Sequence, residues 1–243
     1  MNMRNYTKRG SHGVRFVIST SIVAFAVLGV SRSARATIIV PAPSGITTVT
    51  PGNIPGLPNV NDSYITSETE PFIGYNAQNI VVFQGTVESW VFADPSEPSF
   101  GGQPGLDFVY QLTNNIDGDS RDDPIDRLTV SSFATYQTDV NYIGGTGNVA
   151  PTTADRSAIP GSIVGFNFPT GAMVAPGQNS DQLVVATDDV TTPVQGIASV
   201  IDGGSGYTGA EAPVAAVILT VPEPATFGLL ALAGGMLLGR RRR

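Results

Sequence analysis

The chain contains no cysteine and a single histidine in 243 residues. Without cysteine there is no disulfide scaffold, thiol nucleophile, zinc finger or iron–sulfur cluster. The histidine, His12, lies in an N-terminal segment that we expect to be removed, so the remaining chain lacks a Ser–His–Asp triad and a His-ligated zinc or copper site. Lysine is absent from residues 37–221, which excludes Schiff-base chemistry there.

Charged residues are also scarce, at 14% of the chain, and they are segregated. Six of the 13 basic residues lie within residues 4–35, and four more form the terminal run Arg240–Arg243. Residues 37–221 hold 19 acidic and 3 basic residues, a net charge of −16. Nucleic acid is excluded as a partner of such a surface, because binding it requires cations that neutralise phosphates. Divalent cations suit this surface better.

The N-terminus has the pattern of an export signal. A basic region precedes the apolar run Phe16–Val30, and the small residues Ala34 and Ala36 fit the rule for signal-peptidase cleavage. We therefore predict a signal helix within residues 1–36 and cleavage that leaves Thr37 as the new N-terminus. The alternative is an uncleaved anchor, although a run of about 15 residues is shorter than the roughly 20 that span a bilayer.

The C-terminus combines three features in a fixed order. Pro222, Glu223 and Pro224 come first, and the two prolines keep the chain extended and accessible there. The apolar stretch Phe227–Leu238 follows and predicts a short transmembrane helix. The terminal residues Arg240, Arg241, Arg242 and Arg243 would hold the end of that helix on the cytoplasmic side.

These residues resemble the PEP-CTERM protein-sorting domain of Gram-negative bacteria, over Val221–Arg243. The resemblance implies processing by an exosortase near Pro222–Pro224, and a setting of exopolysaccharide and biofilm production. It implies a membrane-anchored intermediate followed by release to the cell surface or the extracellular space. It implies nothing about the passenger domain, because unrelated domains carry the same tail. The alternative is an ordinary tail anchor, which would not need the Pro-Glu-Pro residues.

The passenger domain is predicted to be all-β. Helix-favouring Lys and Glu are scarce, and no stretch outside the two termini shows a clean helical period. Short runs of alternating apolar residues recur between Gly-, Pro- and Asp-rich breaks. They lie at 79–92, 106–113, 126–133, 162–168, 182–187, 194–201 and 213–220. This number of strands predicts an antiparallel β-sandwich, jelly-roll-like, over residues 72–221, followed by the sorting tail at 222–243.

Two further segments are predicted to lack regular structure. Residues 37–71 are rich in Pro, Gly, Thr and Asn, and we expect a poorly ordered lead-in with one early strand at Thr37–Val40. Residues Gly204–Gly209 match the spacing G-x-G-x-x-G, but Pro213 follows too soon for the helix that a dinucleotide site requires. We therefore predict a hairpin loop there.

The densest acidic segment is a candidate calcium site. Oxygen-bearing side chains spaced two residues apart suit Ca²⁺. The candidate ligands are Asn115, Asp117, Asp119, Asp122 and Asp123. The EF-hand pattern fails, because Asp122 replaces the required glycine and Leu128 stands where a glutamate is needed. The alternative is a solvated loop between strands, with no cofactor bound.

Trp90, the only tryptophan, is a candidate for stacking on a sugar ring. By alternation it shares the more polar face of its strand with Glu88. An exposed indole suits a partly wet site of this kind, whereas the alternative is packing at a sheet edge or under a loop.

Catalysis is not expected. Carboxylate pairs such as Glu88 and Asp107 remain, but no motif marks a pair. We therefore expect a non-catalytic structural or adhesive component of the cell surface or matrix. The alternatives are a carbohydrate-binding module and a secreted glycosidase that uses two carboxylates.

Overall fold

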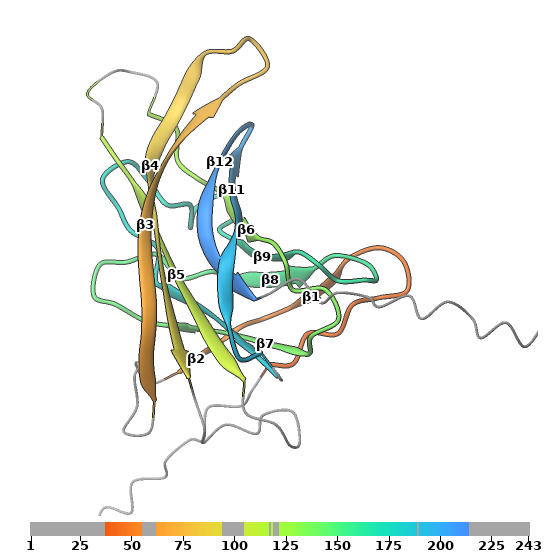
Figure 1. Ribbon diagram of the computed structural model, residues 1–243. Coiled ribbons are helices and arrows are strands. Elements are labelled where there is room, and N and C mark those ends of the chain that lie inside the picture. The colour runs from red at the N-terminus through yellow and green to blue at the C-terminus, as the bar shows by residue number, and fades with distance from the viewer. Residues whose placement is uncertain are drawn as a thin grey trace, which may run out of the picture. The chain divides into compact units, whose positions relative to one another are not determined.

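The computed structural model describes residues 37–54, 62–93, 105–116, 118, 122–188 and 190–213. Every regular element within these ranges is a strand, so the prediction of an all-β passenger is confirmed (Figure 1). The strands are β1 (Thr47–Val49), β2 (Gly52–Asn53), β3 (Ser63–Tyr75), β4 (Val81–Ala93), β5 (Leu106–Asn114), β6 (Arg127–Val130), β7 (Thr138–Ile143), β8 (Thr153–Arg156), β9 (Val164–Asn167), β10 (Gln182–Thr187), β11 (Pro193–Asp202) and β12 (Gly204–Pro213). The predicted signal helix and C-terminal helix lie outside the described residues.

The strands form one curled, hydrogen-bonded sheet in the order β1-β8-β9-β6-β11-β12-β3-β4-β5-β10-β7-β2. Neighbouring strands run antiparallel except β2 and β7, which are parallel. The predicted sandwich of two separate sheets is not confirmed, because the strands remain connected through β12 and β3. That connection has one registered pair, Ser205 with Tyr75, which lets the two halves of the sheet turn across each other (Figure 1).

One hydrophobic core lies between the two halves. Phe108 on β5 and Leu183 on β10 meet Leu128 on β6 and Phe166 on β9, and all four side chains are fully buried. The rings of Phe108 and Phe133 pack edge to face with centroids 5.8 Å apart. The alternation predicted for 106–113 is confirmed on its apolar face, whose four side chains Leu106, Phe108, Tyr110 and Leu112 are buried.

Six of the seven predicted strands overlap observed ones, namely β4, β5, β6, β9, β10 and β11. The seventh, at 213–220, lies outside the described residues except for Pro213. Strands β7 and β8 were not predicted, because they are short and carry polar residues that suggest exposed loops. Asp139, Asn141 and Asp155 are nevertheless buried in these strands.

The predicted hairpin loop at Gly204–Gly209 is wrong, since these residues form the first part of β12. The turn lies one residue earlier, at Gly203, whose φ of +57° favours glycine. A Cβ atom on Gly206 would lie 2.7 Å from the carbonyl oxygen of Ile73. The glycines therefore let the backbone of β12 approach β3 closely, which a sequence pattern of loop residues does not reveal.

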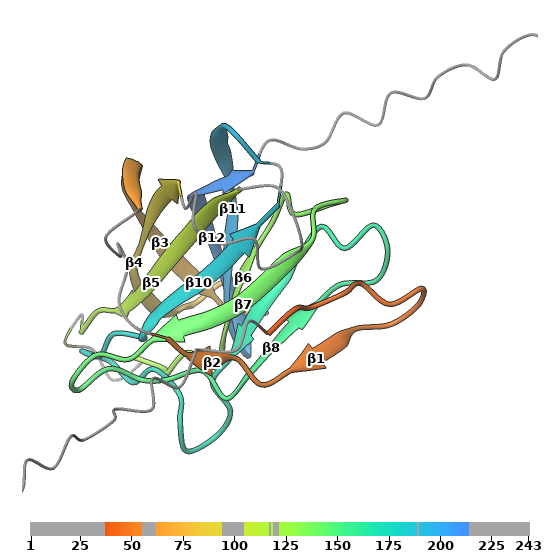
Figure 2. The same ribbon diagram turned by 90° about the horizontal axis from the view of Figure 1, so that it is seen from below.

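The described parts of the predicted lead-in, residues 37–54 and 62–71, belong to the fold. The boundary of the lead-in at 71/72 falls inside β3, and the described residues 37–54 run from one end of the sheet to the other (Figure 2). The predicted early strand reduces to an isolated bridge between Ile38 and Asp139. Ile39 is fully buried, and its N–H donates to the carbonyl of Thr138 at 2.9 Å. Tertiary contacts thus order a segment whose composition is typical of a loop.

A buried guanidinium joins this segment to the rest of the molecule. The Arg156 side chain is fully buried at the end of β8 and uses all five of its N–H donors. The acceptors are the carbonyls of Ile39, Phe133, Tyr136 and Gly161 and the hydroxyl of Thr138, at 2.7–3.1 Å. Burial lowers the pKa of Arg156 to about 10, and Asp188 partly opposes this shift. The side chain therefore stays charged at neutral pH.

Removing this guanidinium is expected to destabilise the fold severely. Arg156→Met removes five donors from this buried cluster. The Ile39 carbonyl keeps the Thr138 hydroxyl as a donor at 3.4 Å, but each buried acceptor left without a donor costs about 1–3 kcal/mol. We expect a decrease of at least about 3 kcal/mol in the free energy of unfolding, measured by urea denaturation of the purified protein. Arg156→Lys keeps the charge but not the planar set of donors, so it should be intermediate. Wild-type stability of the Met variant would contradict this role.

Candidate functional site

The outer face of β3, β4, β5, β10 and β7 carries the side chains that point away from the core. Strand register arranges them in rows across the sheet. One row runs from Trp90 to Val109, Val184 and Asn141. The next row, two residues along each strand, contains Glu88 and Gln111, and the pairing of Leu183 with Tyr110 places Gln182 beside Gln111. The prediction that Trp90 and Glu88 share a face is confirmed.

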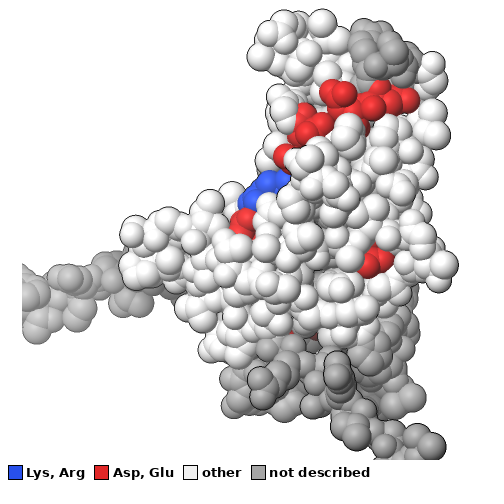
Figure 3. Space-filling view, turned by 180° about the vertical axis from the view of Figure 1, so that it is seen from behind, with Lys and Arg blue, Asp and Glu red and all other residues white. Residues whose placement is uncertain are grey.

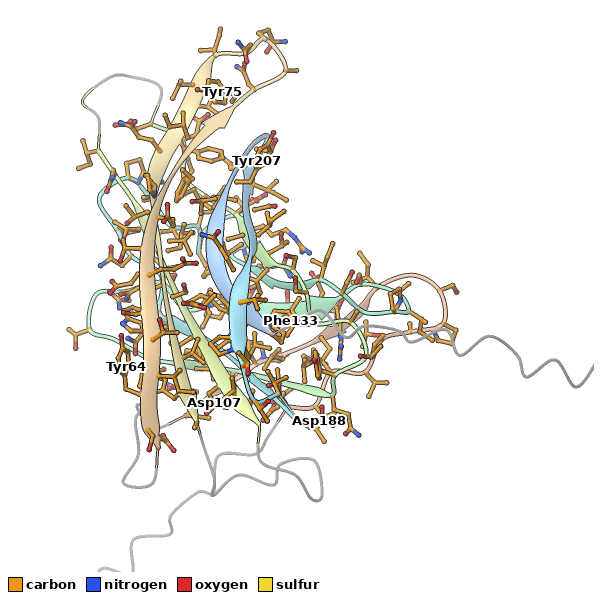
Figure 4. All side chains as sticks on the ribbon, viewed as in Figure 1. Tyr64, Tyr75, Asp107, Phe133, Asp188 and Tyr207 are labelled. Carbon is orange, nitrogen blue, oxygen red and sulfur yellow. The ribbon has the colours of Figure 1, made fainter. Side chains whose placement is uncertain are left out.

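An apolar cluster occupies part of this face. Phe92, Val109 and Val184 are buried in it, and Trp90 is half-buried against them. Tyr64 on β3 packs edge to face on Phe92 with ring centroids 6.0 Å apart. Figure 4 shows Tyr64 toward the same end of the sheet as Asp107, away from Tyr75 and Tyr207. Trp90 thus sits on an interior strand rather than at a sheet edge.

A cavity of about 190 Å³ opens beside the indole, lined by Trp90, Phe92, Val109 and Gln182. We call it the Trp90 cavity. Its floor is apolar, and one wall carries the half-buried amide of Gln182. Next to it, the Gln111 amide is held by donation from its Nε2 to the carbonyl of Ser180 at 3.0 Å. In the part of the chain that the structure describes, the Trp90 indole N–H and the Gln182 amide make no hydrogen bond.

Glu88 and Asp107 lie on this same face but far apart. Glu88 pairs with Gln111, whereas Asp107 pairs with Phe92, four residues further along β4. At about 3.3 Å per residue, their backbone positions differ by roughly 13 Å along the strands. The paired carboxyl groups of glycosidases lie about 5–9.5 Å apart, so this placement does not favour a catalytic pair.

The acidic loop that was a candidate calcium site is described only in part. Asp117 and Asp119 lie outside the described residues, whereas Asn115, Asp122 and Asp123 lie within them. The backbone N–H groups of Asn115 and Asp123 donate to β4, so both ends of the loop are held there. Among the described side chains, no group of three or more acidic residues or histidines is arranged to hold a metal ion.

Asp123 also belongs to a group of carboxylates that sequence reasoning missed. Burial, together with the nearby charges of Asp126 and Asp123, raises the pKa of Asp202 to about 6. Burial likewise raises the pKa of Asp126, against the opposing effect of Arg127. Figure 3 shows most of the acidic side chains on the displayed face gathered toward its upper part, with a further acidic patch lying apart from them. No spacing pattern links residues 123 and 202, so only the fold reveals this group.

A second group of carboxylates joins β3 to β12. Burial raises the pKa of Glu68, and the charges of Glu211 and Glu70 add to that shift. The Thr66 hydroxyl donates to Glu211 at 3.2 Å, and the Tyr110 hydroxyl donates to the Glu211 carbonyl at 2.7 Å. These contacts connect residues more than 100 positions apart and anchor the junction between the two halves of the sheet.

Both cations among the described residues are engaged internally. Arg127 donates to both carboxylate oxygens of Asp155 and to Asn167, and Arg156 is buried as described above. Arg121 lies outside the described residues. The described surface is therefore acidic without compensating free cations, which opposes the binding of anionic ligands.

A second surface hollow lies on the β11–β12 hairpin. It measures about 300 Å³ and is lined by Gln195, Gly196, Ile197, Tyr207, Thr208 and Gly209. Tyr207 is 74% exposed and Ile197 is 59% exposed. This hollow is open and shallow. A substitution in it can serve as a control for substitutions in the Trp90 cavity.

Comparison with known proteins identifies the tail but not the passenger domain. A model of the PEP-CTERM protein-sorting motif matches residues 220–243, which confirms the resemblance seen in the sequence. The motif indicates an exported protein that an exosortase sorts through a membrane-anchored intermediate. No curated protein and no solved structure matches the chain.

The sorting residues themselves lie outside the described part of the structure, including Pro222, Glu223, Pro224 and Arg240–Arg243. The same holds for Ala34 and Ala36, whereas Thr37 is described. Within the described ranges, no helix is long and apolar enough to cross a membrane.

The raised pKa of Asp202 predicts that acid stabilises the fold. Its pKa is about 6 in the folded state and about 3.9 when unfolded, so the folded state binds more protons between these values. The free energy of unfolding should therefore fall as pH rises from about 4 to about 6. Thermal melts at pH 5 and pH 7 should show a higher Tm at pH 5.

The matched variants identify the group responsible. Asp202→Asn should raise the Tm at pH 7 and reduce its dependence on pH. Glu88→Gln, on the outer face of the other half of the sheet, should keep the wild-type pH dependence. A pH profile unchanged by Asp202→Asn would remove this explanation.

Proposed function

We propose that this chain is an exported bacterial surface or extracellular-matrix protein, delivered by an exosortase, whose passenger is a non-catalytic structural or adhesive domain. The observation that carries the sorting part is the motif at residues 220–243. The basic n-region, the apolar run Phe16–Val30 and the small residues before Thr37 support entry through a cleaved signal peptide. We further propose that Phe227–Leu238 forms the transmembrane helix of the intermediate and that exopolysaccharide surrounds the released protein.

The start of the fold supports cleavage after Ala36. The carbonyl of Thr37 accepts a hydrogen bond from the N–H of Val140 at 3.2 Å, and Ile39 is buried two residues later. Residues Thr37 and Ile39, which directly follow the predicted cleavage site, therefore already belong to the fold. Cleavage there would remove the signal without trimming any of these contacts.

Several observations support a passenger without catalysis. Residues 37–221 contain no Cys, His or Lys, and Glu88 and Asp107 are placed too far apart along the sheet to favour a glycosidase pair. The two halves of the sheet enclose one core of apolar side chains, as the layers of a sandwich do. Such an acidic domain with a single apolar core suits a structural or adhesive role in a hydrated matrix.

Carbohydrate binding is the second candidate for the passenger. The Trp90 cavity favours it, because an indole and an amide meet there above an apolar floor. This candidate is compatible with the same route of export and sorting.

Changing Pro222, Glu223 and Pro224 together to Ala should block processing of the tail. The apolar stretch and the Arg run remain, so membrane insertion should persist while the full-length chain accumulates in the membrane. Fractionation of cells carrying a tag after Ala36, with and without their exosortase, measures this. Deletion of Arg240–Arg243 is the comparison, and it should disturb retention or orientation instead. Equal release of wild type and the triple-Ala variant would contradict the sorting proposal.

Export should also leave a defined N-terminus. N-terminal sequencing of the exported protein should begin at Thr37, and Ala36→Leu should inhibit that cleavage by removing the small residue at the site. A chain that still begins at Met1 after export would show that residues 1–36 act as an uncleaved anchor.

A further inference from the structure

We propose that the Trp90 cavity binds one ring of an uncharged saccharide. This inference deepens the carbohydrate-binding candidate of the proposed function and rests on it, but it does not depend on how the tail is sorted. It begins from the two neighbouring rows of side chains on the outer face of the sheet.

The two rows differ in chemistry. The row through Trp90, Val109 and Val184 is apolar, whereas the row through Glu88, Gln111 and Gln182 is polar. They are two residues apart along each strand, or about 7 Å. A pyranose ring has an apolar face of C–H groups and a rim of hydroxyl groups. Such a ring can place its C–H face against the half-buried indole while its hydroxyls reach the polar row.

The size of the cavity limits the ligand. Its volume of about 190 Å³ is below the roughly 300–1,000 Å³ of pockets that enclose larger ligands, so it suits a single ring. The floor offers little apolar area, because Val109 is only 2% exposed and Phe92 only 8%. A protein partner would need about 800 Å² of its own surface buried, which this floor does not favour.

Polar groups with donors and acceptors lie in and beside the cavity. Within the described residues, the indole N–H of Trp90 and the amide of Gln182 have no hydrogen-bond partner. The amide of Gln111 is fixed by its bond to Ser180, which keeps its direction constant. An indole donor, amide groups and the Glu88 carboxylate together provide both donors and acceptors, as the hydroxyls of a sugar require.

The surrounding charge selects against acidic sugars. Glu88 lies in the polar row, two residues along β4 from Trp90. Arg127 and Arg156, the two described cations, are engaged elsewhere. A uronate or sulfate group bound across the polar row would meet the Glu88 carboxylate, so a neutral ring is preferred.

The sole tryptophan makes the site directly observable. The full chain, purified in a polyoxyethylene detergent without sugar headgroups, is titrated with hexaoses of neutral glucan, xylan, mannan and galactan. At least one should change the emission of Trp90 in a saturable way, and hexagalacturonate should not at equal concentration. Absence of a saturable change with every neutral hexaose would overturn the proposal, as would preference for the uronate.

Variants assign the binding to this cavity. Gln182→Ala removes a half-buried amide and retains Trp90 as the reporter, so affinity should fall about tenfold, equivalent to one hydrogen bond. Trp90→Phe, followed by calorimetry, should weaken binding while near-native melting shows that the fold is intact. Tyr207→Ala, in the hollow on β11–β12, is the control and should bind as wild type. Loss of binding in the Tyr207 variant with none in the Gln182 variant would place the site elsewhere and overturn the assignment.

Saccharide binding and tail processing can be tested independently of each other. Saccharide binding by the purified chain combined with unprocessed tail in cells would leave this site standing and remove the sorting function. Normal tail processing combined with no saccharide response would remove the site and leave a structural or adhesive role.

Discussion

The Arg156 guanidinium is the interaction on which the rest of the passenger depends. Its five donors reach the N-terminal segment, the connection from β6 to β7, the start of β7 and the loop after β8. The backbone carbonyls among these acceptors lie outside the regular strand ladders, so a single planar cation satisfies groups that would otherwise be buried without donors. The same side chain holds residues 37–39 against the sheet. An acidic domain therefore uses one of its few cations for internal structure rather than for a ligand.

Strands could be predicted from the sequence where their apolar residues alternate and the same residues are buried in the fold. On β4 and β5, apolar residues at every second position predict both the strands and their buried faces, and the structure confirms them. On β8, Asp155 and Arg156 suggest an exposed turn, yet Arg127 pairs with the first and backbone carbonyls surround the second. These partners come from other parts of the chain. The burial of a charged side chain in a strand can therefore be explained only when its partners in the folded chain are known.

The candidate sites show the same division. Two-residue alternation predicts on which face of β4 Trp90 lies. The cavity beside it also needs Gln182 on β10, which is separated from β4 by several strands along the chain. The groups around Asp202 and Glu68 likewise combine residues that no spacing rule connects. The sorting tail is different, since its three parts are contiguous and can be recognised in the sequence alone. Delivery was therefore predictable, whereas the arrangement of the passenger surface required the fold.

Residue 37 is both the predicted N-terminus of the mature chain and a part of the fold. The exported chain therefore enters the fold without a disordered lead-in. Hydrogen exchange of the exported protein tests this most directly, through the amide of Ile39, which donates to Thr138 beside the Arg156 guanidinium. The account predicts that this amide exchanges as slowly as those of β5 and β10, because both open only when the whole domain unfolds. Rapid exchange at Ile39 while β5 and β10 remain protected would contradict it, since the N-terminal segment would then be a loosely attached tail.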